Sequence, residues 1–113
     1  MTKSKKRWTN DMKIYKVRVL QSAEADIDNL ADFLFENLSR EGAYPYLEFM
    51  RQEVLSLSIY ADCFAESSSK TIHDIHPKAK RMLSHNHKWA YVFHIEGDTV
   101  LVHRVIPSSS ISQ

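Results

Sequence analysis

Apolar residues near the start of the chain are spaced first as in a strand and then as in a helix. Residues 14–20 are rich in β-branched and aromatic side chains, a composition typical of a strand. Behind them, apolar side chains recur at steps of three and four up to Leu38, as on one stripe of an amphipathic helix. Ser22 is expected to cap this helix, because Glu24 and Asp26 then fall where the helix dipole favours negative charge.

A second helix is expected after Gly42, which we interpret as the break between the two helices. Its apolar positions continue at helical spacing to about Ser58, and Pro45 is tolerable in a first helical turn. Two helices joined by a short link pack antiparallel, so this part of the chain predicts a helical hairpin. Residues 61–77 contain three consecutive serines and a proline, and we expect a surface loop there.

The remaining apolar runs predict strands. A short strand is expected at residues 80–84, and longer ones at residues 90–96 and 99–106, with Gly97-Asp98 as the turn between them. The resulting order of elements is β-α-α-β-β-β. This order predicts an α+β fold in which the helical hairpin packs on one face of a small, mostly antiparallel sheet.

The chain has 113 residues, enough for one domain that buries most of its apolar surface. We expect residues 1–11 to form a flexible basic tail, residues 12–107 the domain, and residues 108–113 a serine-rich tail. The sequence contains neither a run of about 20 apolar residues nor a secretion signal, so we expect no membrane association. Cys63 has no second cysteine to pair with, and a cytoplasmic location is therefore expected.

Charge is sorted by segment, although the formal net charge is only +1. Residues 23–66 hold ten acidic side chains against two basic ones. Residues 70–104 hold six basic side chains against three acidic ones, together with all six histidines. Because the acidic part coincides with the expected helices and the basic part with the expected strands, one surface is suited to polyanions or to acidic partner chains.

Basic residues around the expected second strand are candidates for binding nucleic acid or another target. Arginine can hold a phosphate through two hydrogen bonds, and lysine supplies a point charge. Lysines at a sheet edge can instead protect it from aggregation, and both interpretations stand. Trp89 and Tyr91 could stack on bases or belong to the core. The candidates for target binding are Lys78, Lys80, Arg81, Lys88 and Arg104.

The histidines suggest two kinds of chemistry. His85 and His87 would share one side of a strand, and His73 and His76 lie in the expected loop, so either pair could begin a zinc site. No cysteine pair or nearby carboxylate completes a ligand set, and we expect neither a metal nor another cofactor. Imidazole titrates near neutral pH and can move protons in phosphodiester cleavage. The candidates for catalysis are Arg81, His85, His87 and His103.

The ordered pattern of these elements resembles the RelE/ParE toxin superfamily of bacterial type II toxin–antitoxin, or plasmid stabilisation, systems. The resemblance covers about residues 12–107. The segments that carry it are the first strand, the helix entry at residues 22–27, the basic strand at residues 80–83 and the closing strands at residues 89–95 and 100–106. The closing strands with their Gly97-Asp98 turn are the most specific part.

The resemblance implies a small toxin that is held silent by a cognate antitoxin wrapped over it. Members of the superfamily either cut messenger RNA at the ribosome without a metal or poison DNA gyrase. Such a toxin should expose an apolar groove along the helical hairpin or the sheet edge. We expect the side chains of Leu34, Phe35 and Phe49 to line that groove and bind the antitoxin.

The resemblance also bears on the target. Arg81 lies where the superfamily often carries arginine, so it is the first candidate for target contact, with Lys80 next. Ribonuclease members tend to have arginine at the position of Ala90 and a closing His, Tyr or Arg at residues 107–109, where Pro-Ser-Ser stands. Alanine cannot bind a phosphate, and serine is a poor acid–base group at neutral pH.

The expected function is therefore a toxin that arrests growth by binding a cellular target. DNA gyrase is slightly favoured as that target over ribosome-dependent cleavage of messenger RNA. A degenerate, inactive toxin and a non-toxic module that binds nucleic acid or another protein are the alternatives.

Overall fold

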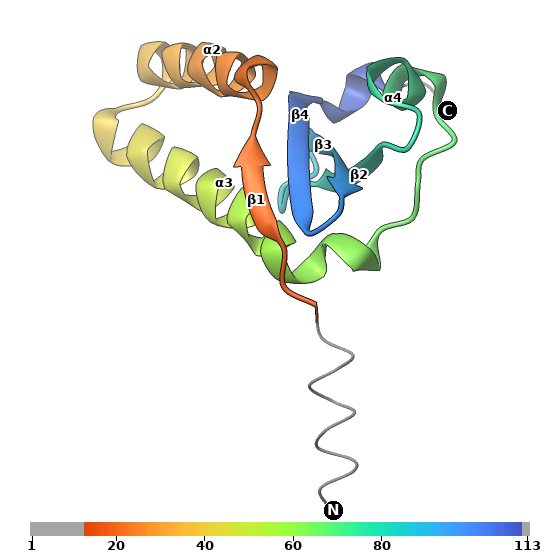
Figure 1. Cartoon of the computed structure of the whole chain (residues 1–113). Helices are drawn as coiled ribbons and strands as arrows, with labels where there is room; N and C mark the ends of the chain where they lie inside the picture. The colour runs from red at the N-terminus through yellow and green to blue at the C-terminus, as the bar shows by residue number, and fades with distance from the viewer. Residues whose placement is uncertain (1–12, 112–113) are drawn as a thin grey trace, which may run out of the picture.

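The structure of the protein is a computed structural model that describes residues 13–111. The tail expected at residues 1–11 therefore lies outside the described residues. Two long helices pack on one side of a four-stranded sheet, and a short helix lies on the other side (Figure 1). The order of the strands and of the two long helices is the one that the sequence predicts.

The long helices α2 (Gln21–Asn37) and α3 (Arg40–Tyr60) form the expected hairpin. The chain turns between them at Leu38 and Ser39, which are both extended, and not at Gly42. The Ser39 hydroxyl caps α3 by accepting a 3.3 Å hydrogen bond from the Gly42 amide, which places Gly42 in the first turn of α3. The prediction of a break at Gly42 is wrong, because a serine cap can start a helix without glycine.

Helix α2 begins one residue before Ser22, so the predicted cap is also wrong. Leu20 occupies the N-cap position, and no side chain caps the helix there. The Ser22 hydroxyl instead donates a 2.6 Å hydrogen bond to the carbonyl oxygen of His103, on strand β4 (Thr99–Pro107). Ser22 therefore ties the first turn of α2 to the sheet.

The sheet has the strand order β1-β4-β3-β2. Strands β2 (Lys80–Leu83) and β3 (Trp89–Glu96) are antiparallel neighbours, as are β3 and β4, whereas β1 (Lys16–Val19) pairs with β4 in parallel. Gly97 forms the β3–β4 turn with a left-handed φ of 63°, which glycine adopts without steric cost. The predicted α+β fold with a mostly antiparallel sheet is confirmed.

Both faces of the sheet are covered, because β3 sends apolar side chains to each face in turn. Tyr91 and Phe93 belong to a large core under the hairpin, and Val92 belongs to a smaller core on the opposite face. The hairpin contributes Ala23, Leu30, Leu34, Ala43, Met50, Val54 and Leu57 to the large core. The smaller core consists of Ile72, Ala79, Ala90, Val92, Ile106 and Ile111.

The segment expected to be a surface loop at residues 61–77 contains a short helix, α4 (Lys70–Ile75), so that prediction is wrong in this part. Ile72 is fully buried and holds α4 against the sheet. A helix of six residues has too few apolar positions to show a period. The serine-rich end also packs on the domain, since Ile111 is only 8% exposed in the smaller core.

Candidate functional site

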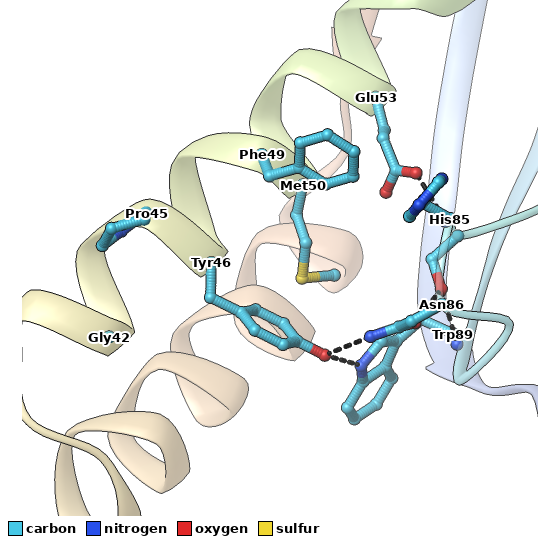
Figure 2. Close-up of a pocket in the computed structure, with 10 residues that line it drawn as sticks. Gly42, Pro45, Tyr46, Phe49, Met50, Glu53, His85, Asn86 and Trp89 are labelled. Atoms are coloured by element: carbon cyan, nitrogen blue, oxygen red, sulfur yellow. Dashed lines mark hydrogen bonds between the residues drawn. The ribbon is translucent and has the colours of Figure 1, made fainter.

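Two hollows meet at Trp89, the first residue of β3. The α3 pocket has a volume of about 310 Å³ and lies between α3 and the β2–β3 turn (Figure 2). The α2 pocket has a volume of about 330 Å³ and lies between α2 and the end of β4. Because Trp89 lines both hollows, we treat them together as one groove at the end of the sheet, the Trp89 groove.

Helical spacing on α3 produces one wall of the α3 pocket. Tyr46, Phe49, Met50 and Glu53 stand at positions i, i+3, i+4 and i+7, which share one side of a helix. Met50 is only 5% exposed and packs in the core, whereas Phe49 is 51% exposed at the rim. The stripe that attaches α3 to the sheet therefore continues outward into the pocket.

Hydrogen bonds hold the polar side chains of this wall in place. The Tyr46 hydroxyl accepts bonds of 3.0 Å from the indole nitrogen of Trp89 and from the Asn86 side chain (Figure 2). The Glu53 carboxylate accepts bonds of 2.6 Å from the Tyr91 hydroxyl and from the His85 amide. Burial, together with the bond to Glu53, raises the pKa of Tyr91 above its ordinary value, so this hydroxyl remains a proton donor at neutral pH.

The opposite wall is the β2–β3 turn, which its own side chains stabilise. The Asn86 side-chain oxygen accepts bonds of 2.7 Å from the Ser84 hydroxyl and 3.0 Å from the Lys88 amide. The Trp89 amide donates a 3.1 Å bond to the Ser84 hydroxyl oxygen. The pocket is therefore formed before any partner arrives, and a partner need not order this wall when it binds.

An ion pair forms the polar end of the α2 pocket. Arg104 donates two hydrogen bonds to the Asp26 carboxylate, of 2.7 Å from Nε and 3.1 Å from the terminal nitrogen. The Val105 amide donates a third, of 2.9 Å, to the same carboxylate. The hydrogen bond to Asp26 raises the pKa of Arg104 above its ordinary value. This guanidinium is therefore engaged within the protein.

Large apolar side chains lie exposed beside the groove on the helical hairpin. Phe35 of α2 and Tyr44 of α3 meet edge to face, with ring centroids 5.1 Å apart, so the exposed surface spans both helices. Phe33 lines the α2 pocket and Phe49 the α3 pocket. We define the hairpin patch as the exposed side chains of Phe33, Phe35, Leu38, Tyr44 and Phe49. A cluster of this kind is typical of a surface that another molecule covers.

The predicted target-binding residues are dispersed. Lys80 and Arg81 are consecutive on β2, and Arg81 pairs with Val92 of the smaller-core face. Lys78 lies in the turn before β2, and Lys88 in the bend before β3; both are exposed. Of the five predicted residues, Arg104 lines the Trp89 groove, and the other four are not among the residues that line it. The role of these side chains in target binding stays a prediction.

The histidines predicted to be catalytic do not share contacts with one another either. His85 and His87 lie in the β2–β3 turn and not on a strand. The His85 ring packs edge to face on Phe49, with centroids 5.5 Å apart. His103 is the extra residue of a β-bulge in β4, and its Nε2 lies 2.7 Å from Nδ1 of His94. Among the described residues, none of these three histidines forms a hydrogen bond or a ring contact with Arg81.

His103 belongs to a histidine cluster that the sequence did not reveal. The His76 ring stacks on His94 with centroids 3.7 Å apart, and His94 is only 5% exposed. Burial, with the charge that His94 would carry, lowers the pKa of both His76 and His103. The three residues come from the end of α4, from β3 and from β4, so no sequence spacing links them. Across residues 13–111, no group of histidine, cysteine and carboxylate side chains is arranged to hold a metal ion.

Two of the three residues expected to contact an antitoxin are exposed. Phe35 and Phe49 belong to the hairpin patch, at 40% and 51% exposure. Leu34 is 5% exposed and packs in the large core, so on this chain it supports the patch from below. Tyr91 is fully buried and cannot stack on bases as one interpretation allowed. The sequence prediction missed Tyr46 and Glu53, although their i, i+7 spacing around Phe49 marks a shared helix side.

Comparison with known proteins supports the fold. No protein-family model and no curated protein matches the sequence. Among solved structures, the chain is similar to a chain of the structure titled "Chromosomal ParDE TA system from P. aeruginosa", with a TM-score of 0.70 and 17% sequence identity. The similarity covers 83% of this chain and 96% of that chain. At this identity the likeness shows a shared fold, the one that the RelE/ParE resemblance implied. None of the helices within residues 13–111 combines the length and apolar character needed to cross a membrane.

Proposed function

We propose that the protein is the toxin component of a type II toxin–antitoxin system. An antitoxin covers the Trp89 groove and the hairpin patch and keeps the toxin silent. Once released, the toxin arrests growth by binding a cellular target. The fold shared with a chain of a ParDE toxin–antitoxin structure supports this class of function.

The observation that carries the proposal is the apolar surface that continues from the groove onto the hairpin. Tyr44 and Phe49 are more than half exposed, at 58% and 51%. Leaving large aromatic side chains in water is unfavourable, at roughly 25 cal/mol for each Å² that a partner could cover. A chain that forms an obligate complex with an inhibitor would retain such a surface. A plain nucleic-acid-binding module would not need it.

The arrangement of the polar residues favours a target that is bound over one that is hydrolysed. Ala90, at a position where ribonuclease members tend to carry arginine, is fully buried in the smaller core. His85 and His103 contact different residues, Phe49 and His94 respectively. Metal-free phosphodiester cleavage requires an acid and a base close to the same phosphate. We therefore propose a gyrase-type target ahead of the ribosome.

Induced expression of the full chain in a bacterial host tests the proposal. We expect growth to stop within a few generations, and co-expression of the product of the adjacent gene to restore it. DNA breaks during the arrest would support the gyrase-type target, whereas truncated messages with intact DNA would point to ribosome-dependent cleavage. Unhindered growth at high soluble yield would contradict the toxin and favour the binding module.

A further inference from the structure

Glu53 is a carboxylate in largely aromatic surroundings. It is partly buried, and the α3 pocket around it is lined by the rings of Tyr46, Phe49, His85 and Trp89 (Figure 2). Its two oxygens each accept a hydrogen bond from a neutral donor, the Tyr91 hydroxyl or the His85 amide. These bonds satisfy the polar atoms but leave the negative charge uncompensated.

No basic side chain within residues 13–111 forms an ion pair with Glu53. Among residues 13–111, the ion pairs are Lys16–Asp98, Lys70–Asp74, His94–Glu96 and Arg104–Asp26. A charged group removed from water is normally paired, because desolvation of an unpaired charge costs free energy. A cation entering the pocket would therefore gain more here than at an exposed carboxylate.

The aromatic rings favour the same kind of ligand. The face of an aromatic ring attracts a cation, and tryptophan and tyrosine do so most strongly. A guanidinium group is planar, stacks on rings and can donate two hydrogen bonds to one carboxylate. The rim residue Phe49 is 51% exposed, so a side chain can reach its ring from outside.

We propose that the α3 pocket receives one arginine side chain of the partner protein, stacked among the aromatic rings and paired with Glu53. The segment that carries this arginine is otherwise apolar, because the hairpin patch lies beside the pocket. That this partner is an antitoxin rests on the proposed function, whereas the preference of the pocket for an arginine side chain does not. Ten acidic residues against two basic ones in residues 23–66 add a long-range attraction for a basic segment.

A titration followed by ¹H–¹⁵N NMR on the labelled full chain tests the pocket without a partner. The probe is N-acetyl-arginine amide, and N-acetyl-citrulline amide is its uncharged analogue of the same shape. We expect the arginine probe to shift the Trp89 indole and His85 amide signals with a dissociation constant in the millimolar range, roughly fivefold tighter than citrulline. Equal binding of the two probes would overturn the proposal.

Variants separate the charge from the shape of the pocket. E53Q should weaken binding of the arginine probe roughly fivefold and leave citrulline unchanged, whereas E48Q, an exposed carboxylate on the same helix, should leave both unchanged. If E53Q disturbs the fold, which its own spectrum would show, F49L gives the test, since it removes only an exposed aromatic ring. Undiminished arginine binding in F49L and in a folded E53Q would contradict the proposed mode. Growth arrest that the adjacent gene product relieves, combined with no arginine binding, would refute this inference and leave the proposed function intact.

Discussion

At the residue scale, one carboxylate connects the first long helix to the last strand. Asp26 accepts bonds from the Arg104 side chain and from the Val105 amide, and its side chain is only 16% exposed. Hydrogen bonds to a charged group contribute more than neutral ones, and a backbone amide left without its acceptor costs free energy. Asp26 therefore fixes how α2 sits over the end of β4, where the α2 pocket forms.

The substitution D26N should lower the free energy of unfolding by about 1–2 kcal/mol. An amide oxygen cannot accept all three bonds, and the charge opposite Arg104 disappears. Urea denaturation followed by circular dichroism measures the loss. The matched control is D28N, two residues away on the exposed side of α2, which should change stability by less than about 0.5 kcal/mol.

The histidine cluster makes stability depend on pH. The pKa values of His76 and His103 are lowered by burial and by their neighbours, so the folded chain binds these protons less readily than the unfolded chain. The groups that face the cluster are His94, Glu96 and Lys78. When the folded pKa of a histidine is depressed, its contribution to the free energy of unfolding is fully present above the unfolded pKa of about 6.5. That contribution is lost as the pH falls below this value.

The free energy of unfolding should accordingly fall between about pH 7 and pH 5, by at most about 1.4 kcal/mol per pH unit for each histidine. Urea denaturation at a series of pH values gives the slope. In H103Q the slope should be smaller than in the native chain, while H73Q, an exposed histidine outside the cluster, should retain it. Parallel slopes in native protein and H103Q would exclude a role for the cluster.

At the element scale, the two tight turns of the sheet use the same backbone conformation with different residues. Gly97 in the β3–β4 turn and His87 in the β2–β3 turn both have a φ of 63°. This region favours glycine, and a residue with a Cβ atom pays a cost there. The β2–β3 turn borders the α3 pocket, so some strain is held next to the proposed binding site.

Opposite changes in the two turns should have opposite effects. H87G should raise the free energy of unfolding by about 1 kcal/mol, and G97A should lower it by about the same amount. A Cβ atom at Gly97 would meet no heavy atom within 4 Å, so the loss there would come from the backbone alone. Thermal denaturation of both variants compares them directly; a stabilising G97A would contradict this explanation.

At the scale of the whole molecule, the apolar surface continues from the Trp89 groove onto the hairpin patch of the two acidic helices. Phe49 belongs both to the α3 pocket and to the hairpin patch, so we expect it to be the central contact for the proposed partner. Interfaces derive most of their binding energy from a few such aromatic residues. Their exposure in the free chain means that they contribute little to its own stability.

The substitution F49D should weaken binding of the adjacent gene product roughly tenfold or more while leaving the fold stable. Isothermal titration calorimetry with the purified partner measures the affinity. L55D is the matched control, because Leu55 is 46% exposed on a different side of α3. Equal weakening by both variants would place the partner elsewhere on the hairpin.

Much of the fold could be predicted because it follows from repeated local patterns. The nearly continuous apolar runs of β3 and β4 reflect burial on both faces of the sheet, and the steps of three and four in α2 and α3 reflect burial on one face of each helix. The β3–β4 turn at Gly97 could also be predicted, because a left-handed residue in a tight turn favours glycine. By contrast, α4 was missed because one buried side chain, Ile72, gives no repeat.

Less of the site could be predicted from the sequence, because the site depends on contacts between residues that are far apart in the chain. The charge separation and the exposed Phe35 and Phe49 could be read from composition and helical position. The pairing of Arg104 with Asp26, the stacking of His76 on His94 and the meeting of Tyr46 with Trp89 join elements far apart in the chain. Their positions are set by strand order and helix packing, which no local pattern encodes. The sequence determined which elements form and which faces they bury. The tertiary structure decided which polar side chains became partners, and it placed Glu53 in a pocket where it has hydrogen-bond donors but no ion-pair partner among residues 13–111, because these contacts join elements far apart in the chain.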